Sequence, residues 1–365
     1  MSLSDSELLA RLTGAIMERI PASYGTDAQL ETTPPIELHR RYSFMFRYHI
    51  RLPNGMRQTI LVKIPHDYWM KTLHEAVESE HIRGVITSEF ETMTVIANAI
   101  EEANEPKLAA IRPRALLLPY KALLMDEIPI KMLKTILSKI PIILGMKKDW
   151  DELENYLHLS GKWLRVIHRK YAHEQMSLPA LAVMERVEKS LAAINPAHGR
   201  SLDALHNLFR KLYDSIKTVQ VSSASLHNDY HPGNVFLTDD GRIGALDPNW
   251  MEKGSIYTDL ASMLVYPVTG KMAVLTQGIL FRKSLRKRYE KAVLRGYFDR
   301  GESADPILLF YCASAILEKW QDNIARLRSE KSLWYRAASK LLILWNGFYF
   351  RRLVNDYLLR GLLGK

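Results

Sequence analysis

The chain has 365 residues, of which 47% are hydrophobic and 25% are charged, a balance typical of a soluble globular protein with room for two lobes. Its formal net charge of +10 favours anionic partners and argues against a strongly cationic substrate. The single cysteine, Cys312, excludes an internal disulfide framework, suits a reducing cytoplasm and lies in an apolar stretch that predicts a core position.

The N-terminus shows no signal-peptide pattern, because no basic segment leads into an apolar one. The most hydrophobic stretches, residues 128–146 and 340–350, are short or interrupted by Lys, Pro and Asn, so no run approaches the ~18 apolar residues of a membrane span. We therefore predict a cytoplasmic protein that does not span a membrane. Residues 1–3 fit a native start and a remnant of an expression tag equally.

The first 128 residues predict a small α+β lobe. Residues 38–65 predict a pair of strands, because extended patterns flank a Pro-Asn-Gly turn at residues 53–55. Residues 70–104 predict a helix, since their apolar side chains recur at three- and four-residue spacing. Residues 115–125 predict a further strand, after which we expect a hinge.

The remaining residues, 129–365, predict a larger and mainly helical lobe. Residues 151–172 predict one amphipathic helix and residues 180–217 a second. Short strands and turns interrupt this lobe at residues 226–247, and helices resume to the C-terminus. A β-rich lobe, a hinge and a helical lobe with one inserted hairpin are typical of kinase-like folds. We therefore predict an α+β, protein-kinase-like two-lobe fold.

The most specific motif lies in that inserted hairpin, which begins Leu-His-Asn-Asp-Tyr-His-Pro-Gly-Asn-Val at residue 226. Asp229 and Asn234 are five residues apart, and Asp247 follows thirteen residues after Asn234 at the end of an apolar strand. Phosphoryl transfer needs a carboxylate to accept the proton of the attacking hydroxyl. It also needs an amide oxygen and a second carboxylate to hold Mg²⁺ against the phosphates. A simple turn between two strands would explain the Pro and Gly of the motif, but it would not explain why His227, Asp229 and Asn234 occur together.

The motif resembles the catalytic loop of aminoglycoside phosphotransferases, choline kinases and their relatives, whose pattern runs His-Gly-Asp-x-His-Pro-x-Asn. The resemblance implies that Asp229 is the general base. It implies that Asn234 and Asp247 are the metal ligands, with Asn234 also part of the catalytic set. The implied cofactors are ATP and Mg²⁺.

Neighbouring residues are expected to support the loop. The resemblance implies that His227 braces it, that His231 supports it from behind, and that Asp259, in an Asp-Leu-Ala motif, ties it down by hydrogen bonds. Two positions depart from the family pattern. Asn228 replaces a Gly, and we expect Asn to accept the left-handed backbone that Gly allows. Pro248 directly follows the metal-binding Asp and is expected to favour extended backbone before it.

The small lobe is expected to hold the nucleotide. Lys63 lies on a strand between apolar neighbours, and the resemblance implies that it grips the α- and β-phosphates and pairs with a helix Glu. Glu89 matches that Glu best, and Glu91 is the alternative on another helix face. The phosphate-covering turn at residues 40–45 has no Gly, and Ser43 is the candidate donor there. The linker strand implies adenine contacts from the backbone near Asp126 and Ile128. The resemblance covers about residues 38–265.

Two C-terminal segments are rich in basic and aromatic residues. Residues 282–295 contain seven basic residues against Glu290, and residues 331–365 contain seven against Asp356. Ordinary surface helices explain such segments, and an anionic membrane surface or an anionic acceptor are the alternatives. No nucleic-acid-binding motif accompanies the charge, so we do not expect nucleic acid as a partner.

The sequence thus predicts an ATP-dependent phosphotransferase that moves the γ-phosphate to a hydroxyl of a small-molecule, sugar, glycan or lipid-linked acceptor. A kinase-fold scaffold protein without transfer would be expected to lack Lys63, Asp229 or Asp247, and all three are present. A protein kinase is disfavoured because the loop reads His-Asn-Asp, and an aminoglycoside-resistance kinase is an alternative that the basic charge opposes. The identity of the acceptor, the choice of ATP over GTP, the oligomeric state and peripheral contact with a membrane stay open.

Overall fold

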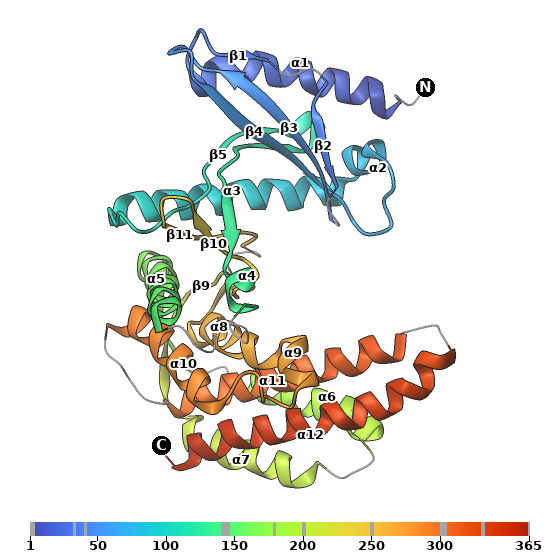
Figure 1. Cartoon of the computed structure of the whole chain (residues 1–365), viewed down its shortest axis with the longest axis vertical. Helices are drawn as coiled ribbons and strands as arrows, with labels where there is room; N and C mark the ends of the chain where they lie inside the picture. The colour runs from blue at the N-terminus through green and yellow to red at the C-terminus, as the bar shows by residue number, and fades with distance from the viewer. Residues whose placement is uncertain are drawn as a thin grey trace. The chain divides into compact units, whose positions relative to one another are not determined.

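The computed structural model describes residues 4–31, 34–39, 42–139, 147–177, 180–198, 202–248, 252–299, 305–329 and 333–363. The chain forms two compact units (Figure 1). The first unit comprises Met1–Ile130 with Thr238–Trp250, and the second comprises Lys131–Leu237 with Met251–Lys365. The division into functional domains at residue 128 stays a prediction.

An antiparallel sheet dominates the first unit, with strand order β1-β3-β4-β6-β5 and with β2 paired to β3. Its strands are β1 Gln29–Leu30, β2 Ile36–His39, β3 Ser43–Arg51, β4 Arg57–Pro65, β5 Pro113–Leu117 and β6 Ala122–Asp126. β3 and β4 form the hairpin predicted around residues 53–55, and alternate side chains of both strands enter one apolar core. The predicted pair of strands is confirmed.

The single strand predicted at residues 115–125 is wrong. The chain instead turns back through a 3₁₀ turn, Leu118–Tyr120, so that β5 and β6 pair antiparallel. Pro119 at the turn has no N–H for a sheet ladder, and Lys121 adopts a left-handed φ of 47°. An apolar run with one Pro therefore contains two short strands.

Three helices flank this sheet: α1 Asp5–Tyr24, α2 Leu73–Glu78 and α3 Glu80–Ala103. The single helix predicted at residues 70–104 is wrong, because Ser79 takes extended backbone and caps α3 through the N–H of Ile82. Helix α1 was not predicted from the sequence, although Ser4 and Glu7 form a capping box at its start.

The second unit is mainly helical, as predicted. Its helices are α4 Leu133–Leu137, α5 Lys147–Lys170, α6 Ala180–His198, α7 Asp203–Ile216, α8 Tyr257–Thr269, α9 Lys271–Leu275, α10 Lys283–Phe298, α11 Pro306–Ser329 and α12 Leu333–Leu363. α5 confirms the helix predicted at 151–172. The helix predicted at 180–217 is two helices, since α6 ends two residues after Pro196 and α7 begins at Asp203.

Short strands complete the fold. β8 Ala172–Ser177, β9 Gln220–Ser225 and β12 Lys253–Ser255 form a small antiparallel sheet in the second unit. The chain passes from one unit to the other within β7 Ile130–Met132 and again within β10 Val235–Thr238, and β11 Ile243–Ala245 lies in the first unit.

α5 and α10 cross at unusually close range in the second unit. A Cβ at Gly161 would clash with the backbone oxygen of Val293, and a Cβ at Gly296 would clash with that of His158. Only Gly lets the two backbones approach this far, so these two positions fix the crossing.

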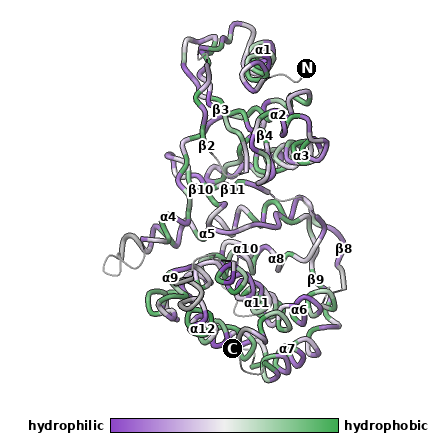
Figure 2. Tube along the Cα trace, turned by 90° about the vertical axis from the view of Figure 1, so that its right-hand side faces the viewer, coloured by the Kyte–Doolittle hydropathy of each residue, from purple (hydrophilic) through white to green (hydrophobic). Residues whose placement is uncertain are grey.

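Cys312 is fully buried in α11, which confirms the predicted core position. Burial also raises the pKa of its thiol, so it is not a reactive nucleophile. Within the described ranges, no helix is long and apolar enough to cross a membrane. α12 alternates between hydrophobic and hydrophilic residues along its length (Figure 2).

Candidate active site

The catalytic-loop segment is tied to the start of α8 by one buried carboxylate. Asp259 accepts hydrogen bonds from the backbone N–H groups of His227 at 2.7 Å and Asn228 at 2.9 Å. It also lies 3.0 Å from Nε2 of His168, whose Nδ1 lies 2.8 Å from the hydroxyl of Tyr297. The predicted role of Asp259 as the anchor of the loop is confirmed.

Aromatic rings hold the same loop against α5. Tyr230 is fully buried, stacks on Trp163 with ring centroids 5.5 Å apart, and donates its hydroxyl to the backbone oxygen of Ser160 at 2.7 Å. His227 packs edge-on against both Trp163 and Tyr230. His227 therefore lies in the packed base of the loop, which is the position that a bracing residue needs.

Asp229 is oriented by two side chains of its own loop. The amide nitrogen of Asn234 donates to Oδ2 of Asp229 at 2.7 Å and to its backbone oxygen at 3.1 Å. Nε2 of His231 lies 3.2 Å from Oδ1 of Asp229. The Nδ1 atom of His231 accepts the N–H of Gly233 at 2.9 Å, so a neutral ring carries its proton on Nε2 and donates it to Asp229.

Space and stacking hold His231 in this position. Its ring stacks on Tyr266 of α8 with centroids 5.0 Å apart. A Cβ at Gly233 would come within 2.6 Å of the His231 ring, so any larger residue there would displace the imidazole.

The Asp229 carboxylate is suited to accept a proton. Burial raises its pKa, but the hydrogen bond and charge of His231 and the hydrogen bond of Asn234 outweigh burial and hold the pKa below its ordinary value of 3.8. About half of the side chain, 49%, is exposed. The group is therefore ionised at neutral pH and accessible to a hydroxyl.

A second polar group forms in the first unit. Nζ of Lys63, on β4, lies 2.6 Å from Oε1 of Glu89 on α3 and 3.4 Å from Oδ1 of Asp247. Burial lowers the pKa of Lys63, but the carboxylates of Glu89 and Asp247 outweigh burial and raise it. Glu89 faces Lys63, whereas Glu91 lies exposed on the same helix. The structure thus joins three sequence-predicted residues from distant parts of the chain.

The segment that carries Asp247 is fixed to the first unit by backbone hydrogen bonds. The N–H of Ile243 donates to the oxygen of Lys107 at 2.9 Å, and the N–H of Ala109 donates to the oxygen of Ile243 at 2.7 Å. Four residues later the Asp247 side chain is 65% exposed. Its carboxylate is therefore held on an anchored segment and open to solvent.

Two backbone expectations have different outcomes. Asn228 adopts a left-handed φ of 61°, which confirms that Asn can replace Gly there. Asp247 has a φ of 51°, so the extended backbone expected before Pro248 is wrong. The residue before Pro is disfavoured mainly in the right-handed helical region, and Asp tolerates the left-handed region better than most residues.

The remaining candidate nucleotide-binding residues lie in or just after strands of the first unit's sheet. Ser43 begins β3 and is buried, while Arg40 and Arg41 of the predicted phosphate-covering turn lie outside the described residues. Asp126 ends β6, and its carboxylate accepts hydrogen bonds from Tyr24 at 2.7 Å and from Arg114. Ile128 follows two residues later, beyond the sheet. The Asp126 side chain is thus occupied within the unit, which leaves its backbone as the adenine-binding candidate.

The donor groups fit Mg²⁺. Asn234 donates its amide nitrogen to Asp229, so its oxygen is the atom left to ligate, and Asp247 supplies an exposed carboxylate. Mg²⁺ prefers oxygen ligands and is commonly held by one or two protein groups together with substrate phosphates. Across the described part of the chain, no group of three or more His, Cys, Asp or Glu side chains could hold a metal by itself.

Sequence reasoning missed several supporting residues. Trp163 of α5 and Tyr266 of α8 contact the loop directly. His168 contacts the loop anchor Asp259, and Tyr297 of α10 contacts His168 in turn. Neither a local pattern nor a spacing marked them. His231 was expected only to support the loop, yet it contacts the Asp229 carboxylate directly.

Comparisons with known proteins show similarity to one family and to several solved structures. A family model described as the phosphotransferase enzyme family matches residues 150–303. A glucosamine kinase in complex with glucosamine, ADP and inorganic phosphate is similar in fold, with 12% identity, a TM-score of 0.50, and 98% of this chain and 99% of that chain covered. A second crystal form of glucosamine kinase gives a TM-score of 0.51 at 12% identity, with the same coverage of both chains.

An amicoumacin kinase in complex with AMP-PNP and Ca²⁺ is similar as well, with 14% identity, a TM-score of 0.50 and 96% of both chains covered. No curated protein matches the sequence. At these identities the structural likeness shows the fold. The predicted kinase-like two-lobe fold and the predicted resemblance to the aminoglycoside phosphotransferase type are confirmed.

Proposed function

We propose that this protein is an ATP-dependent phosphotransferase that moves the γ-phosphate of ATP to a hydroxyl of a small-molecule acceptor. The single observation that carries the proposal is the Asp229 carboxylate, which His231 and Asn234 orient while it stays half exposed. The family match at residues 150–303 includes this loop and supports the same reaction class.

In this proposal Asp229 is the general base. Its carboxylate accepts the proton of the acceptor hydroxyl while the hydroxyl oxygen bonds to the γ-phosphorus and the bond between that phosphorus and ADP breaks. Asn234 orients the base, and its amide oxygen and the Asp247 carboxylate are the proposed ligands of Mg²⁺. When bound, the metal supplies charge neutralisation at the phosphates.

Lys63 is the proposed phosphate-binding cation. Glu89 holds its ammonium group at 2.6 Å and keeps it charged despite burial. We propose that Ser43 is the donor that covers the nucleotide phosphates and that the backbone at Asp126 and Ile128 contacts adenine. These positions follow the order of nucleotide contacts in kinases.

The acceptor is proposed to be neutral or anionic, of the sugar, glycan or lipid-linked class, and met in the cytoplasm or at its membrane surface. The net charge of +10 supports this choice over a polycation, because a basic protein repels cationic substrates. A sugar acceptor is in keeping with the glucosamine kinase of similar fold.

A screen of hydroxyl acceptors by coupled ADP release tests the proposal. The panel holds neutral sugars, sugar phosphates, a lipid-linked sugar and a polycationic aminoglycoside, each with Mg²⁺ and ATP or GTP. We expect the highest acceptor-dependent rate with a neutral or anionic compound. A highest rate with the aminoglycoside would contradict the proposed acceptor class, and no acceptor-dependent ADP release would contradict transfer itself.

A further inference from the structure

One surface of the second unit exposes large hydrophobic side chains from α9, the turn that follows it, and α12. We call this surface the apolar face; it consists of Met272, Leu275, Ile279, Leu341, Trp345 and Phe348, which are between 41% and 71% exposed. Isolated exposed hydrophobic residues are ordinary, but a contiguous group of them marks an interaction surface.

Two hydrogen bonds show that the two parts of the apolar face adjoin. The indole nitrogen of Trp345 donates to the backbone oxygen of Leu275 at 3.2 Å, and the side-chain amide of Gln277 donates to the backbone oxygen of Trp345 at 2.8 Å. Leu341, Trp345 and Phe348 recur at four- and three-residue spacing and therefore share one side of α12. The turn after α9 and this side of α12 thus present a single surface.

Positive charge surrounds the apolar face. Residues 271–282 and 340–352, which carry it, contain five basic and no acidic residues. Lys271, Arg282, Lys340 and Arg352 among them are exposed. Aromatic and aliphatic side chains within a basic rim are the features that let a protein lie on an anionic membrane without spanning it. A second copy of this chain is a poor occupant, because it would bring the same cations to the same surface.

A cavity of about 260 Å³ adjoins the apolar face, between the end of α8, the start of α10 and α12. Its charged lining is Lys283, Arg286, Arg352 and Asp356, so cations exceed carboxylates by two. The backbone oxygen of Gln277 accepts a hydrogen bond from Arg352 at 2.5 Å, which joins the cavity to the turn of the apolar face.

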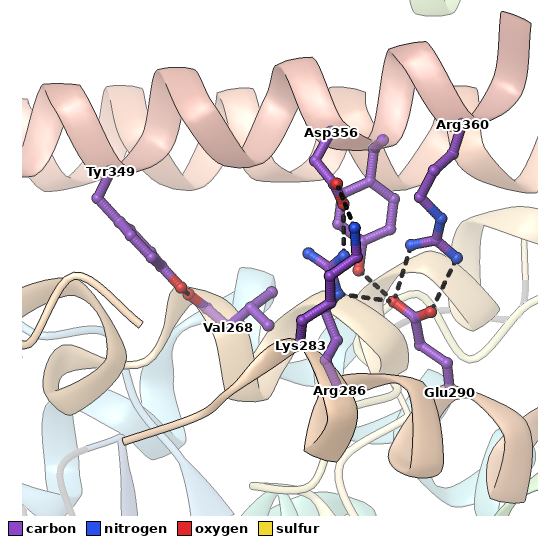
Figure 3. A network of polar contacts seen from close by, with 8 residues as sticks. Val268, Lys283, Arg286, Glu290, Tyr349, Asp356 and Arg360 are labelled. Atoms are coloured by element: carbon purple, nitrogen blue, oxygen red, sulfur yellow. Dashed lines mark hydrogen bonds and ion pairs between the residues drawn. The ribbon is translucent and has the colours of Figure 1, made fainter. Parts of the chain in front are cut away.

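One cation of this cavity, Arg286, is buried and held in place by a network of polar contacts (Figure 3). Asp356 pairs with Arg286 and lies 3.6 Å from Nζ of Lys283. Glu290 lies 3.6 Å from Nε of Arg286 and 3.0 Å from Arg360, and Tyr357 donates its hydroxyl to Glu290 at 2.7 Å. Because the network fixes Arg286 before any ligand arrives, little ordering is needed to bind an anionic group.

We propose that the apolar face enters the headgroup region of an anionic membrane while the cavity of Lys283, Arg286 and Arg352 receives the phosphate of an anionic phospholipid. This inference deepens the proposed function, because it names the surface through which the enzyme meets a membrane. It does not require transfer activity, so binding and catalysis can fail independently.

Sedimentation with vesicles tests the proposal. Wild-type protein is expected to sediment with phosphatidylcholine vesicles that contain phosphatidylglycerol, and not with phosphatidylcholine alone. High salt should weaken binding, since each basic residue near an anionic surface contributes about fivefold in affinity. Free inorganic phosphate should not displace the protein, and displacement would mean that the cavity is a site for free phosphate instead.

Matched variants locate the surface. Ile279→Ser and Phe348→Ser are expected to weaken vesicle binding about tenfold each, whereas Leu181→Ser, a change at a residue of α6 that is 65% exposed, should leave it unchanged. The double variant Lys283→Gln and Arg352→Gln should weaken vesicle binding more than the control double variant Lys211→Gln and Lys217→Gln, which also removes two positive charges. Equal binding by the Ile279 and Leu181 variants, or equal binding to neutral vesicles, would overturn the proposal. A dimer in sedimentation velocity that Phe348→Ser dissociates, without vesicle binding by wild type, would assign the face to a second copy.

Discussion

At the scale of residues, the position of Asp229 depends on hydrogen bonds that form within six residues of chain. Asn234 donates to the carboxylate, and His231 can donate to it because Gly233 occupies the other ring nitrogen. The motif brought these residues close together in the chain, but neither the contact of Asn234 nor that of His231 with the carboxylate was predicted from the sequence. The left-handed backbone of Asn228 was predictable, because Asn accepts the left-handed backbone that Gly allows. The roles of His168 and Tyr297 were not predictable. His168 is 91 positions from Asp259 and 129 positions from Tyr297, so these residues meet only in the folded chain.

The balance of forces on Asp229 predicts the pH dependence of a His231→Ala variant. In the wild type the pKa lies below 3.8, so protonation of the base limits kcat/KM only at more acidic pH. Removal of His231 takes away its hydrogen bond and its charge, the two largest contributions that lower the pKa, and leaves burial, which raises it, opposed mainly by the hydrogen bond of Asn234. We expect the acid limb of the pH profile of kcat/KM to move to higher pH. His206→Ala on α7 is the control, and an acid limb at the same pH in both variants would contradict this account.

Lys63 gives a second prediction at this scale. Glu89→Gln removes its nearer carboxylate, so burial lowers the pKa of the ammonium group and its hold on nucleotide phosphates weakens. Gln can still accept a hydrogen bond from Lys63 but carries no charge, and a charge-assisted hydrogen bond is about twice as strong as a neutral one, so we expect calorimetry to find ATP bound about fivefold to tenfold more weakly. Glu91→Gln should bind ATP like the wild type, and the opposite ranking would mean that the wrong face of α3 has been chosen.

At the scale of elements, the sequence predicted the elements whose turn residues or apolar spacing lie within the element itself. The turn at residues 53–55 predicted the β3–β4 hairpin, whereas one apolar run at 115–125 concealed two strands. The break at Ser79 was missed because the helical spacing continues on both sides of it. α5 was predicted from its apolar stripe, but its contact with α10 depends on Gly161 and Gly296, which no pattern within either helix marks.

The α5–α10 crossing predicts the effect of Gly296→Ala on stability. Its Cβ would meet a backbone oxygen of His158, and neither helix backbone can move aside as a flexible side chain would. Overpacking typically costs about 1–3 kcal/mol, so we expect a lower urea midpoint. Gly84→Ala in α3 has no atom within 4 Å of the new Cβ and should raise stability by about 0.5–1 kcal/mol. Equal midpoints for the two variants would contradict the close crossing.

At the scale of the whole molecule, the proposed catalytic residues are divided between the two units. Lys63, Glu89 and Asp247 belong to the first unit, while Asp229 and Asn234 belong to the second. The sequence predicted these five residues as site candidates from the spacing of one motif and from the order of the strands and helices. It did not identify the acceptor, because the surface that reads a substrate carries no fixed motif and its charge fits several anionic partners.

The most direct test of the central claim compares transfer and nucleotide binding in an Asp229→Asn variant. Acceptor-dependent ADP release is measured with Mg²⁺ and ATP, and ATP affinity is measured by calorimetry on the same preparations. We predict that transfer falls about 10²–10⁴-fold, because a positioned base is lost, while ATP affinity stays close to that of the wild type. Turnover by Asp229→Asn equal to that of the wild type would contradict the assignment of this loop as the catalytic centre.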